Sequence, residues 1–469
     1  MSGLFATLSQ SSQSLHAQSV GIEVAGRNLA NVNNVDYARQ RVVFGDRGTV
    51  LLPQGAQSLG IEAKSIQQLR DALIDQQVGR ELASKASLSA ENDVYAKTQS
   101  ALGESIDRTQ SATSPAAGMS GVVSDFFNAF KAFAASPTDV GQRQHLIQQA
   151  EILVDRFNST DARLAQVQTD VGTNIVADVD TVNNLLATVA SLNAQIGGFE
   201  INAPGTAVDL RDQRQAAIEK LAGLIGAETA INATQAGQLD VFVRDASGTA
   251  ITLVSLATVS NPVNYIGTGL TAGTAGTPIA LASGSINGFF TARDGAVQTL
   301  RDNLNTYAGQ IGSAVNAAYN PTNTSGADFF SFTPGAAAST LSLATGLTPV
   351  TLKSSNGAAG DNTLASAVAA LSARVFSTTS GDSIDGTFSQ YYAGVVSDFG
   401  RTVAGTTNRL EDQSNITKLV NQQRQSLSGV SMDEEMADLL KYQHAFEASS
   451  KVISIIDGLL DIVVNRLGA

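Results

Sequence analysis

Apolar residues recur at alternating steps of three and four along the last stretch of the chain, Ser431 to Leu467. This spacing is a heptad register, and it predicts one amphipathic helix with a narrow apolar seam. Ser431, followed three residues later by Glu434, predicts a capping box at the start of that helix. The seam of the predicted helix consists of Leu439, Tyr442, Phe446, Ile453, Ile456, Leu460, Val463 and Leu467.

The same alternation runs along residues 4–32 at the other end of the chain. Neither terminal segment has an adjacent globular core of its own, and a single helix of this kind is marginal in water. We therefore expect the two ends to pair as a coiled coil, which is the assembly seam of the chain. The alternative is an ordinary pair of terminal helices packed on a globular core. The large apolar residues of the N-terminal seam are Leu4, Leu8, Leu15, Ile22 and Leu29.

Between the termini, helical spacing dominates, and the longest pattern, 142–196, predicts a helix long enough to form a rod. The pair Ser136-Pro137 fits an N-cap followed by proline at the first helical position. Proline-free spacing from Ile66 to Ile106 predicts another long helix. Further helices are predicted at 122–133, 210–224, 285–318, 363–376 and 387–427.

Composition changes after Gly226, where residues Glu228 to Ser285 become rich in Thr, Val, Gly and Ala. Two-residue alternation there, as in Leu239 to Val243, predicts short strands joined by turns. The predicted fold is mainly α with a small β insertion, in a nested, rod-like arrangement of domains. The expected parts are a terminal coiled-coil assembly domain with its connector (1–60 and 428–469), a helical rod domain (61–227 and 286–427, irregular over 320–386) and a β-rich inserted outer domain (228–285).

Composition also excludes several partners and chemistries. The net charge of −13 and the pI near 4.7 argue against binding to nucleic acid or to an anionic membrane surface. The chain has no cysteine, so it has neither disulfides nor thiolate ligands. Only 6% of its residues are aromatic and none is tryptophan, so we expect mainly aliphatic cores. The most apolar run carries Asp457, Asp461 and Arg466, which argues against a membrane span, and Met1 to Ser14 lacks the pattern of a secretory signal.

No constellation of residues predicts catalysis, a cofactor or a metal site. The three histidines, His16, His145 and His444, lack the spacing of metal ligands. The chain contains neither a phosphate-binding loop of the G-x-x-x-x-G-K-[ST] type nor a G-x-S-x-G nucleophile elbow. A secreted enzyme or adhesin with a helical stalk is an alternative, but Asp240 and Arg244 are too few polar residues to support it.

Residues 31–40, Asn-Val-Asn-Asn-Val-Asp-Tyr-Ala-Arg-Gln, resemble the signature Asn-x-Asn-Thr-x-Gly-Tyr-x-Arg-Gln of the bacterial flagellar axial family. The chain departs from that signature at Asn34, where the family has Thr, and at Asp36, where it has Gly. The Arg39-Gln40 pair that ends the signature is the variant typical of members at the hook-filament junction. The start of the C-terminal helix resembles the same family. The matching residues are Asn31, Asn33, Tyr37, Arg39 and Gln40, with Asp433, Glu434, Glu435, Tyr442 and Gln443.

This resemblance implies a structural subunit rather than an enzyme. Such a subunit would join hook to filament by polymerising with its own copies through the terminal helices. The implied partners are the hook protein, hook-associated protein 3 and an export chaperone on the C-terminal helix. The implied location is the extracellular hook-filament junction, reached by type III export. A hook or rod protein of the same family is the alternative, but a hook protein should be mostly β between its ends.

Overall fold

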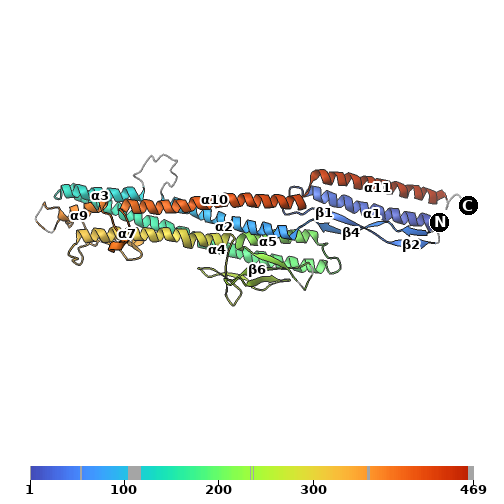
Figure 1. Ribbon diagram of the computed structural model, residues 1–469, viewed down its shortest axis with the longest axis horizontal. Coiled ribbons are helices and arrows are strands. Elements are labelled where there is room, and N and C mark those ends of the chain that lie inside the picture. Colours follow the sequence, from blue (N-terminus) through green and yellow to red (C-terminus); the bar gives the residue numbers. More distant parts are fainter. Residues whose placement is uncertain are drawn as a thin grey trace. The chain divides into compact units, whose positions relative to one another are not determined.

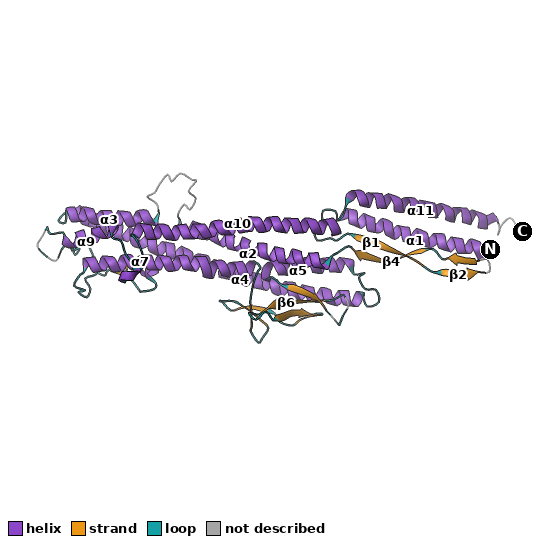
Figure 2. Ribbon diagram, viewed as in Figure 1, coloured by secondary structure: helices purple, strands orange, loops and turns teal. Residues whose placement is uncertain are grey.

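The computed structural model describes residues 2–52, 55–103, 118–232, 234–235, 237–355, 357 and 360–462. The elements are labelled in Figure 1 and coloured by type in Figure 2. The helices are α1 (Ser2–Ala30), α2 (Ala72–Leu102), α3 (Met119–Ala135), α4 (Val140–Phe199), α5 (Val208–Ile225), α6 (Ser285–Phe290), η2 (Thr291–Val297), α7 (Gln298–Tyr319), α8 (Ala337–Thr340), α9 (Thr363–Ala370), η3 (Leu371–Ala373), η4 (Thr378–Ser380), α10 (Phe388–Ser428) and α11 (Met432–Asp461). The strands are β1 (Gln40–Asp46), β2 (Thr49–Leu52), β3 (Gly55–Ser58), β4 (Ile61–Gln68), β5 (Glu228–Ile231), β6 (Leu239–Arg244), β7 (Ala250–Ser255), β8 (Thr258–Val259), β9 (Val263–Tyr265), β10 (Leu270–Ala272), β11 (Thr277–Ile279), β12 (Phe330–Ser331) and β13 (Ser342–Leu343).

The chain forms two compact units. The first contains Met1–Ala86, Asp178–Gly284 and Asp412–Ala469, and the second contains Ser87–Ala177 and Ser285–Glu411. Helices α2, α4 and α10 therefore contribute residues to both. The fold is mainly α with a small β insertion, as the sequence predicted. The finer division into terminal, rod and outer domains stays a prediction.

In the first unit, α1 and α11 lie side by side and run in opposite directions (Figure 1). Ser14 on α1 receives a hydrogen bond from Ser449 on α11 (3.3 Å), and Asn28 donates one to Glu435 (2.9 Å). Strands β1 and β4 form an antiparallel ladder that packs on α1, and β2 pairs with β3. The two ends of the chain are thus joined into one structure.

The β insertion consists of two small antiparallel sheets, with strand orders β5-β6-β7-β8 and β11-β10-β9. Two asparagines on α4 bind their main chains. Asn183 donates to Val263 O (2.8 Å) and accepts from Val263 N (2.9 Å). Asn193, which is fully buried, donates to Leu239 O (2.7 Å) and Leu256 O (2.8 Å). Both sheets are therefore fixed to α4 along its length, in addition to their covalent connections.

Most buried side chains of the second unit are aliphatic, as expected, but a cluster of aromatic rings is packed among them. Phe126 packs against Phe130, with ring centroids 5.2 Å apart, and Tyr307 stacks on Tyr392 at 5.5 Å. Composition could not predict this cluster, because it does not show that the few aromatic residues are gathered in one place. The fully buried aromatic side chains are Phe126, Phe127, Phe130, Phe133, Phe157, Tyr307, Phe329, Phe330, Phe376 and Phe388.

A π-helix, η2, separates α6 from α7. Its buried residues, Ala292 and Val297, are five positions apart, a step that an α-helix cannot keep on one face but a π-helix can. Gln168 on α4 donates to the carbonyl of Arg293 (3.1 Å). A helix predicted as continuous over 285–318 therefore contains an altered turn that keeps its apolar residues inside.

One predicted helix start, at Ile66, and one predicted N-cap, at Ser136-Pro137, are wrong, and capping by aspartates explains both. The helix predicted from Ile66 begins at Ala72, because Ile66 belongs to β4 and the Asp71 carboxylate accepts a hydrogen bond from Leu73 N (2.8 Å). The next long helix begins at Val140 rather than near Pro137. There, Asp139 accepts from the first free N–H groups, with a distance of 2.7 Å to Gly141 N.

Helix α4 alone, among the described helices, is long and apolar enough to cross a membrane. Its apolar side chains, such as Leu153, Leu164 and Val182, are fully buried within the protein. A core helix has this property, and length and composition alone do not distinguish the two cases.

Candidate functional site

The signature stretch 31–40 forms the connection between α1 and β1, and Asn28 in the last turn of α1 organises it. The Asn28 amide donates to Gln40 O (2.8 Å), and its oxygen accepts from Gln40 N (3.0 Å) and from the Tyr37 hydroxyl (2.8 Å). These bonds satisfy every polar group of a side chain that is almost fully buried. Asn28 thereby turns the chain back along the helix it has just left.

Arg39 connects this stretch to the break between α10 and α11. Its backbone N–H donates to the carbonyl of Ser428, the last residue of α10 (2.8 Å). Its guanidinium donates to Glu435 (2.7 Å) and to Glu434 (2.5 Å) at the start of α11. Burial opposes the charge on Arg39, but the two carboxylates raise its pKa above the usual value.

This geometry corrects the predicted capping box. Ser431 has the extended backbone of an N-cap, but its side chain makes no capping hydrogen bond. Glu434, which a capping box would turn back toward Ser431, instead binds Arg39. The guanidinium carries a full positive charge in addition to its N–H donors, whereas a backbone amide does not, so the cation takes the carboxylate.

Glu435 lies at the centre of the contact between the two ends. It is 3% exposed, and its two oxygens accept from Arg39 Nε and from Asn28 Nδ2 (2.9 Å). A carboxylate this buried is tolerated only when both oxygens have donors. We call Asn28, Arg39 and Glu435 the polar layer.

A second cluster of charged side chains, centred on Arg70, binds the signature loop to α2 and α5. Arg70 donates to Asp212 on α5 (2.7 Å), to Asp75 on α2 (3.1 Å) and to the carbonyl of Asp36 in the loop (3.0 Å). Arg424 near the end of α10 binds Glu219 on α5. Burial raises the pKa of the Asp212 carboxyl, even though Arg70 opposes that shift.

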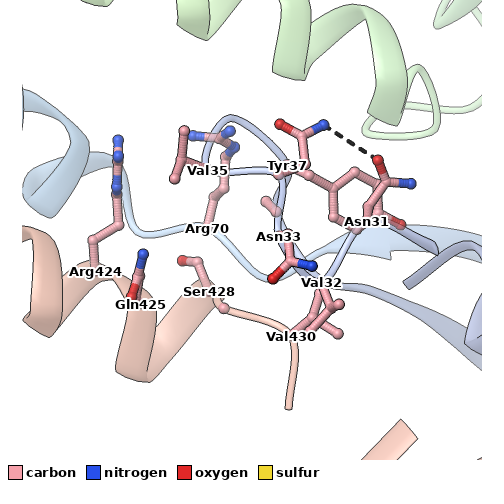
Figure 3. Close-up of a pocket in the computed structure, with 13 residues that line it drawn as sticks. Asn31, Val32, Asn33, Val35, Tyr37, Arg70, Arg424, Gln425, Ser428 and Val430 are labelled. Carbon is pink, nitrogen blue, oxygen red and sulfur yellow. Dashed lines mark hydrogen bonds between the residues drawn. The ribbon is translucent and has the colours of Figure 1, made fainter. Parts of the chain in front are cut away.

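A pocket of about 420 Å³ lies between the loop and the C-terminal end of α10. Figure 3 shows the side chains that line it, among them Arg70, Arg424, Val32 and Val430. The arginines are already bound to carboxylates, which leaves no uncompensated positive charge for an anion. Within the described ranges, no three His, Asp or Glu residues are placed to hold a metal ion.

The contacts between α1 and α11 recur every seven residues. Ser14 meets Ser449, Gly21 lies against the ring of Tyr442, and Asn28 binds Glu435. Each step of seven along α1 is matched by a step of seven back along α11. These contacts use small and polar residues, and the Tyr442 ring also packs against Phe44 at 5.9 Å.

The leucine-rich seam predicted for assembly flanks these contacts. Ile456 is buried, whereas Val463 and Leu467 lie outside the described residues. Their role in assembly stays a prediction. The half-buried members of the predicted seam are Leu4, Leu8, Leu15, Ile22, Leu29, Leu439, Phe446, Ile453 and Leu460.

The predicted signature residues divide into two groups. Tyr37, Arg39 and Gln40 enter the buried network with Glu434 and Glu435, as described above. The others lie at its edge. Asn31 donates to Arg27 O (3.0 Å) and accepts from Asn34 (3.2 Å), whereas Asn33, Asp433 and Gln443 are exposed.

Sequence reasoning missed Asn28, Arg70, Asp75 and Arg424. Asn28 lay on a predicted helix face without a heptad role, and the arginines pair with residues that are distant in sequence. One signal for this cluster is present in the sequence: the stretch Asp212-Gln213-Arg214, which contains Asp212, resembles the flagellar axial family.

Comparison with known protein families gives two matches along the chain. Residues 81–330 match the model of the "Flagellar hook-associated protein FlgK helical domain". The chain belongs to this family. Residues 421–467 also match the C-terminal segment of the flagellar basal body rod FlgEFG proteins. Members of the FlgK family are structural proteins of the bacterial flagellum, and the chain is an axial structural protein rather than an enzyme.

Whole-length relatives agree with the family match. Flagellar hook-associated protein 1 of Bacillus subtilis is 25% identical over 526 residues, covering 100% of this chain and 99% of the relative. Its Escherichia coli counterpart is 24% identical, with 96% and 98% covered. The flagellar hook junction protein FlgK from Burkholderia pseudomallei shares the fold, with a TM-score of 0.61 at 15% identity over 75% of this chain and 100% of that one.

Proposed function

We propose that this chain joins hook to filament, polymerising with its own copies through α1 and α11. The observation that carries this proposal is that α11 is apolar on two faces. One face meets α1. The second is exposed and consists of Met436, Leu440, Val452, Ile455, Leu459 and Ile462.

The exposed face has the spacing of a helix-packing surface. Val452, Ile455, Leu459 and Ile462 alternate at steps of three and four, and Ile455 is 60% exposed. An apolar row of this kind on a folded protein marks an interaction site. A neighbouring copy of the same helix pair is the partner that the family implies, with the hook protein and hook-associated protein 3 at the two ends of the ring.

The same face suits an export chaperone before assembly. A helix with two apolar faces would associate non-specifically while unpaired, and a chaperone that covers it prevents this. We therefore place the chaperone on α11, with type III export delivering the chain to the extracellular junction.

A hook or rod protein is the runner-up, and the helical domain weighs against it. The match over 421–467 is shared with rod proteins, but residues 81–330 match the hook-associated protein. The predicted outer position of the β insertion belongs to this proposal and is tested by antibody labelling of assembled flagella.

The experiment is complementation of a deletion strain that lacks this protein. Ile455→Asp places a charge on the exposed face, which removes roughly 2 kcal/mol of burial and adds a desolvation cost in the assembled state. We expect a folded protein, no recovery of motility and unpolymerised flagellin in the medium. Leu460→Asp tests the predicted seam in the same way.

The matched control is Ser450→Asp, which adds the same charge at an exposed polar position of the same helix. It should restore motility. Normal motility with Ile455→Asp would show that the exposed face of α11 is not an assembly surface.

A further inference from the structure

The contacts between α1 and α11 restrict the register of the two helices to different degrees. Ser14 and Ser449 are small, and Gly21 offers Tyr442 only a flat backbone surface. If α11 slid by seven residues, Tyr442 would lie opposite Ser14 and Ser449 opposite Thr7. Thr7 is an acceptable neighbour for Ser449, but Tyr442 would meet the Cβ atom of Ser14 in place of the bare backbone of Gly21, so packing opposes the slip by roughly 1–3 kcal/mol.

The polar layer is different, because it is satisfied in one register only. After the same slip, Glu435 would lie opposite Gly21, seven residues from Asn28. A step of seven residues is about 10 Å along a helix, well beyond hydrogen-bond distance. The Glu435 carboxylate would then lose its bonds to both Arg39 and Asn28.

The charges of the polar layer add to the cost of any other register. Arg39 faces three carboxylates of α11, since Asp438 lies 3.9 Å from it in addition to Glu434 and Glu435. Without the guanidinium, three negative charges would gather within one turn, one of them buried. A single buried polar layer is a well-attested device for fixing the register of paired helices.

We propose that Arg39 is a positioning residue that acts through Glu435 to fix the register of α11 on α1. The hydrogen bond from Arg39 N–H to Ser428 O also holds Arg39 at the end of α10. Arg39 therefore contacts both sides of the break between α10 and α11. This inference concerns the isolated chain and does not depend on assembly at the hook-filament junction.

The test uses engineered disulfides, which are specific because the chain has no cysteine of its own. Ser14→Cys with Ser449→Cys reports the native register, since the two hydroxyl oxygens lie 3.3 Å apart. Thr7→Cys with Ser449→Cys reports a slip of seven residues. In the native register that second pair is separated by about 10 Å along the helices, too far for a disulfide.

In the parent background, we expect the native pair to oxidise and the slipped pair to stay reduced. Arg39→Met should slow oxidation of the native pair at least about tenfold and allow the slipped pair to form. Glu435→Gln, which keeps the shape and removes the charge, should act in the same direction. Arg41→Met is the matched control, because Arg41 is exposed on β1 two residues after Arg39, and it should change neither rate.

Two results would overturn the proposal. One is native-pair oxidation at the parent rate in both Arg39→Met and Glu435→Gln. The other is loss of the native disulfide without any gain of the slipped one, because a layer that only stabilises the helix pair would lower both. The experiment needs neither flagella nor motility, so its failure would leave the proposed function untouched.

Discussion

Gly21 allows α11 to approach α1 closely, and replacing it with alanine should push the two helices apart. A Cβ atom at this position would lie 2.9 Å from Cγ of Tyr442 and 3.0 Å from each Cδ. Carbon atoms pack best at about 3.5–4.0 Å, so the ring or the helix must move. Overpacking of this kind costs roughly 1–3 kcal/mol.

The higher helix propensity of alanine offsets part of this cost. Alanine is better than glycine inside a helix by about 1 kcal/mol. The net result for Gly21→Ala is therefore a destabilisation of the α1–α11 pair by up to about 2 kcal/mol. That corresponds to a loss of up to about thirtyfold in protection against hydrogen exchange.

Gly26 supplies the matched control on the same helix, since nothing lies within 4 Å of a Cβ placed there. Gly26→Ala should increase protection by the helix-propensity term alone. The assay is hydrogen exchange of the α11 amides in the isolated chain, measured for both variants. In a Tyr442→Ala background, Gly21→Ala should become stabilising, because the clash has been removed. Equal gains from the two glycine substitutions in the parent chain would refute the contact.

Three further predictions concern buried polar groups. The hydroxyl of Tyr307 is buried without a hydrogen-bond partner among the described residues, so Tyr307→Phe should raise the free energy of unfolding of the second unit by about 1 kcal/mol in thermal denaturation. Burial raises the pKa of Glu91, against the opposing charge of Arg409. This carboxyl stabilises the fold when protonated and loses that contribution as pH rises through its folded pKa, so Glu91→Gln should raise the Tm at neutral pH, with a difference that shrinks on acidification. Asn193→Ala removes three hydrogen bonds to the β insertion and should weaken its anchoring by about 2–4 kcal/mol, seen as faster exchange in β6 with no change in the second unit.

The long-range architecture could be predicted because periodicity is a local property of the sequence. The helix from 142 to 196 and the strands after Glu228 were both visible as repeats of apolar residues, and both are present. The predicted capping box failed for a different reason. Ser431 and Glu434 have the right spacing, but Arg39 lies almost four hundred residues earlier in the chain and takes the carboxylate.

The candidate site shows the same limit. Tyr37, Arg39 and Glu435 could be named from the family resemblance, but their partners could not. Asn28 makes its bonds only because α1, β1 and α11 meet at one point, which is a product of tertiary folding. The π-helix was also beyond prediction, since a five-residue step in the apolar pattern resembles a simple irregularity.

The two asparagines that hold the β insertion have a consequence for how its sequence can change. Asn183 and Asn193 donate to main-chain carbonyls of the insertion, and every residue type supplies a carbonyl. Substitutions on the outer side chains of the insertion therefore leave the anchor intact, as do longer loops between its strands. The surface residues of the insertion can therefore change in sequence, while the ten-residue spacing of the two asparagines keeps its attachment points on α4 constant.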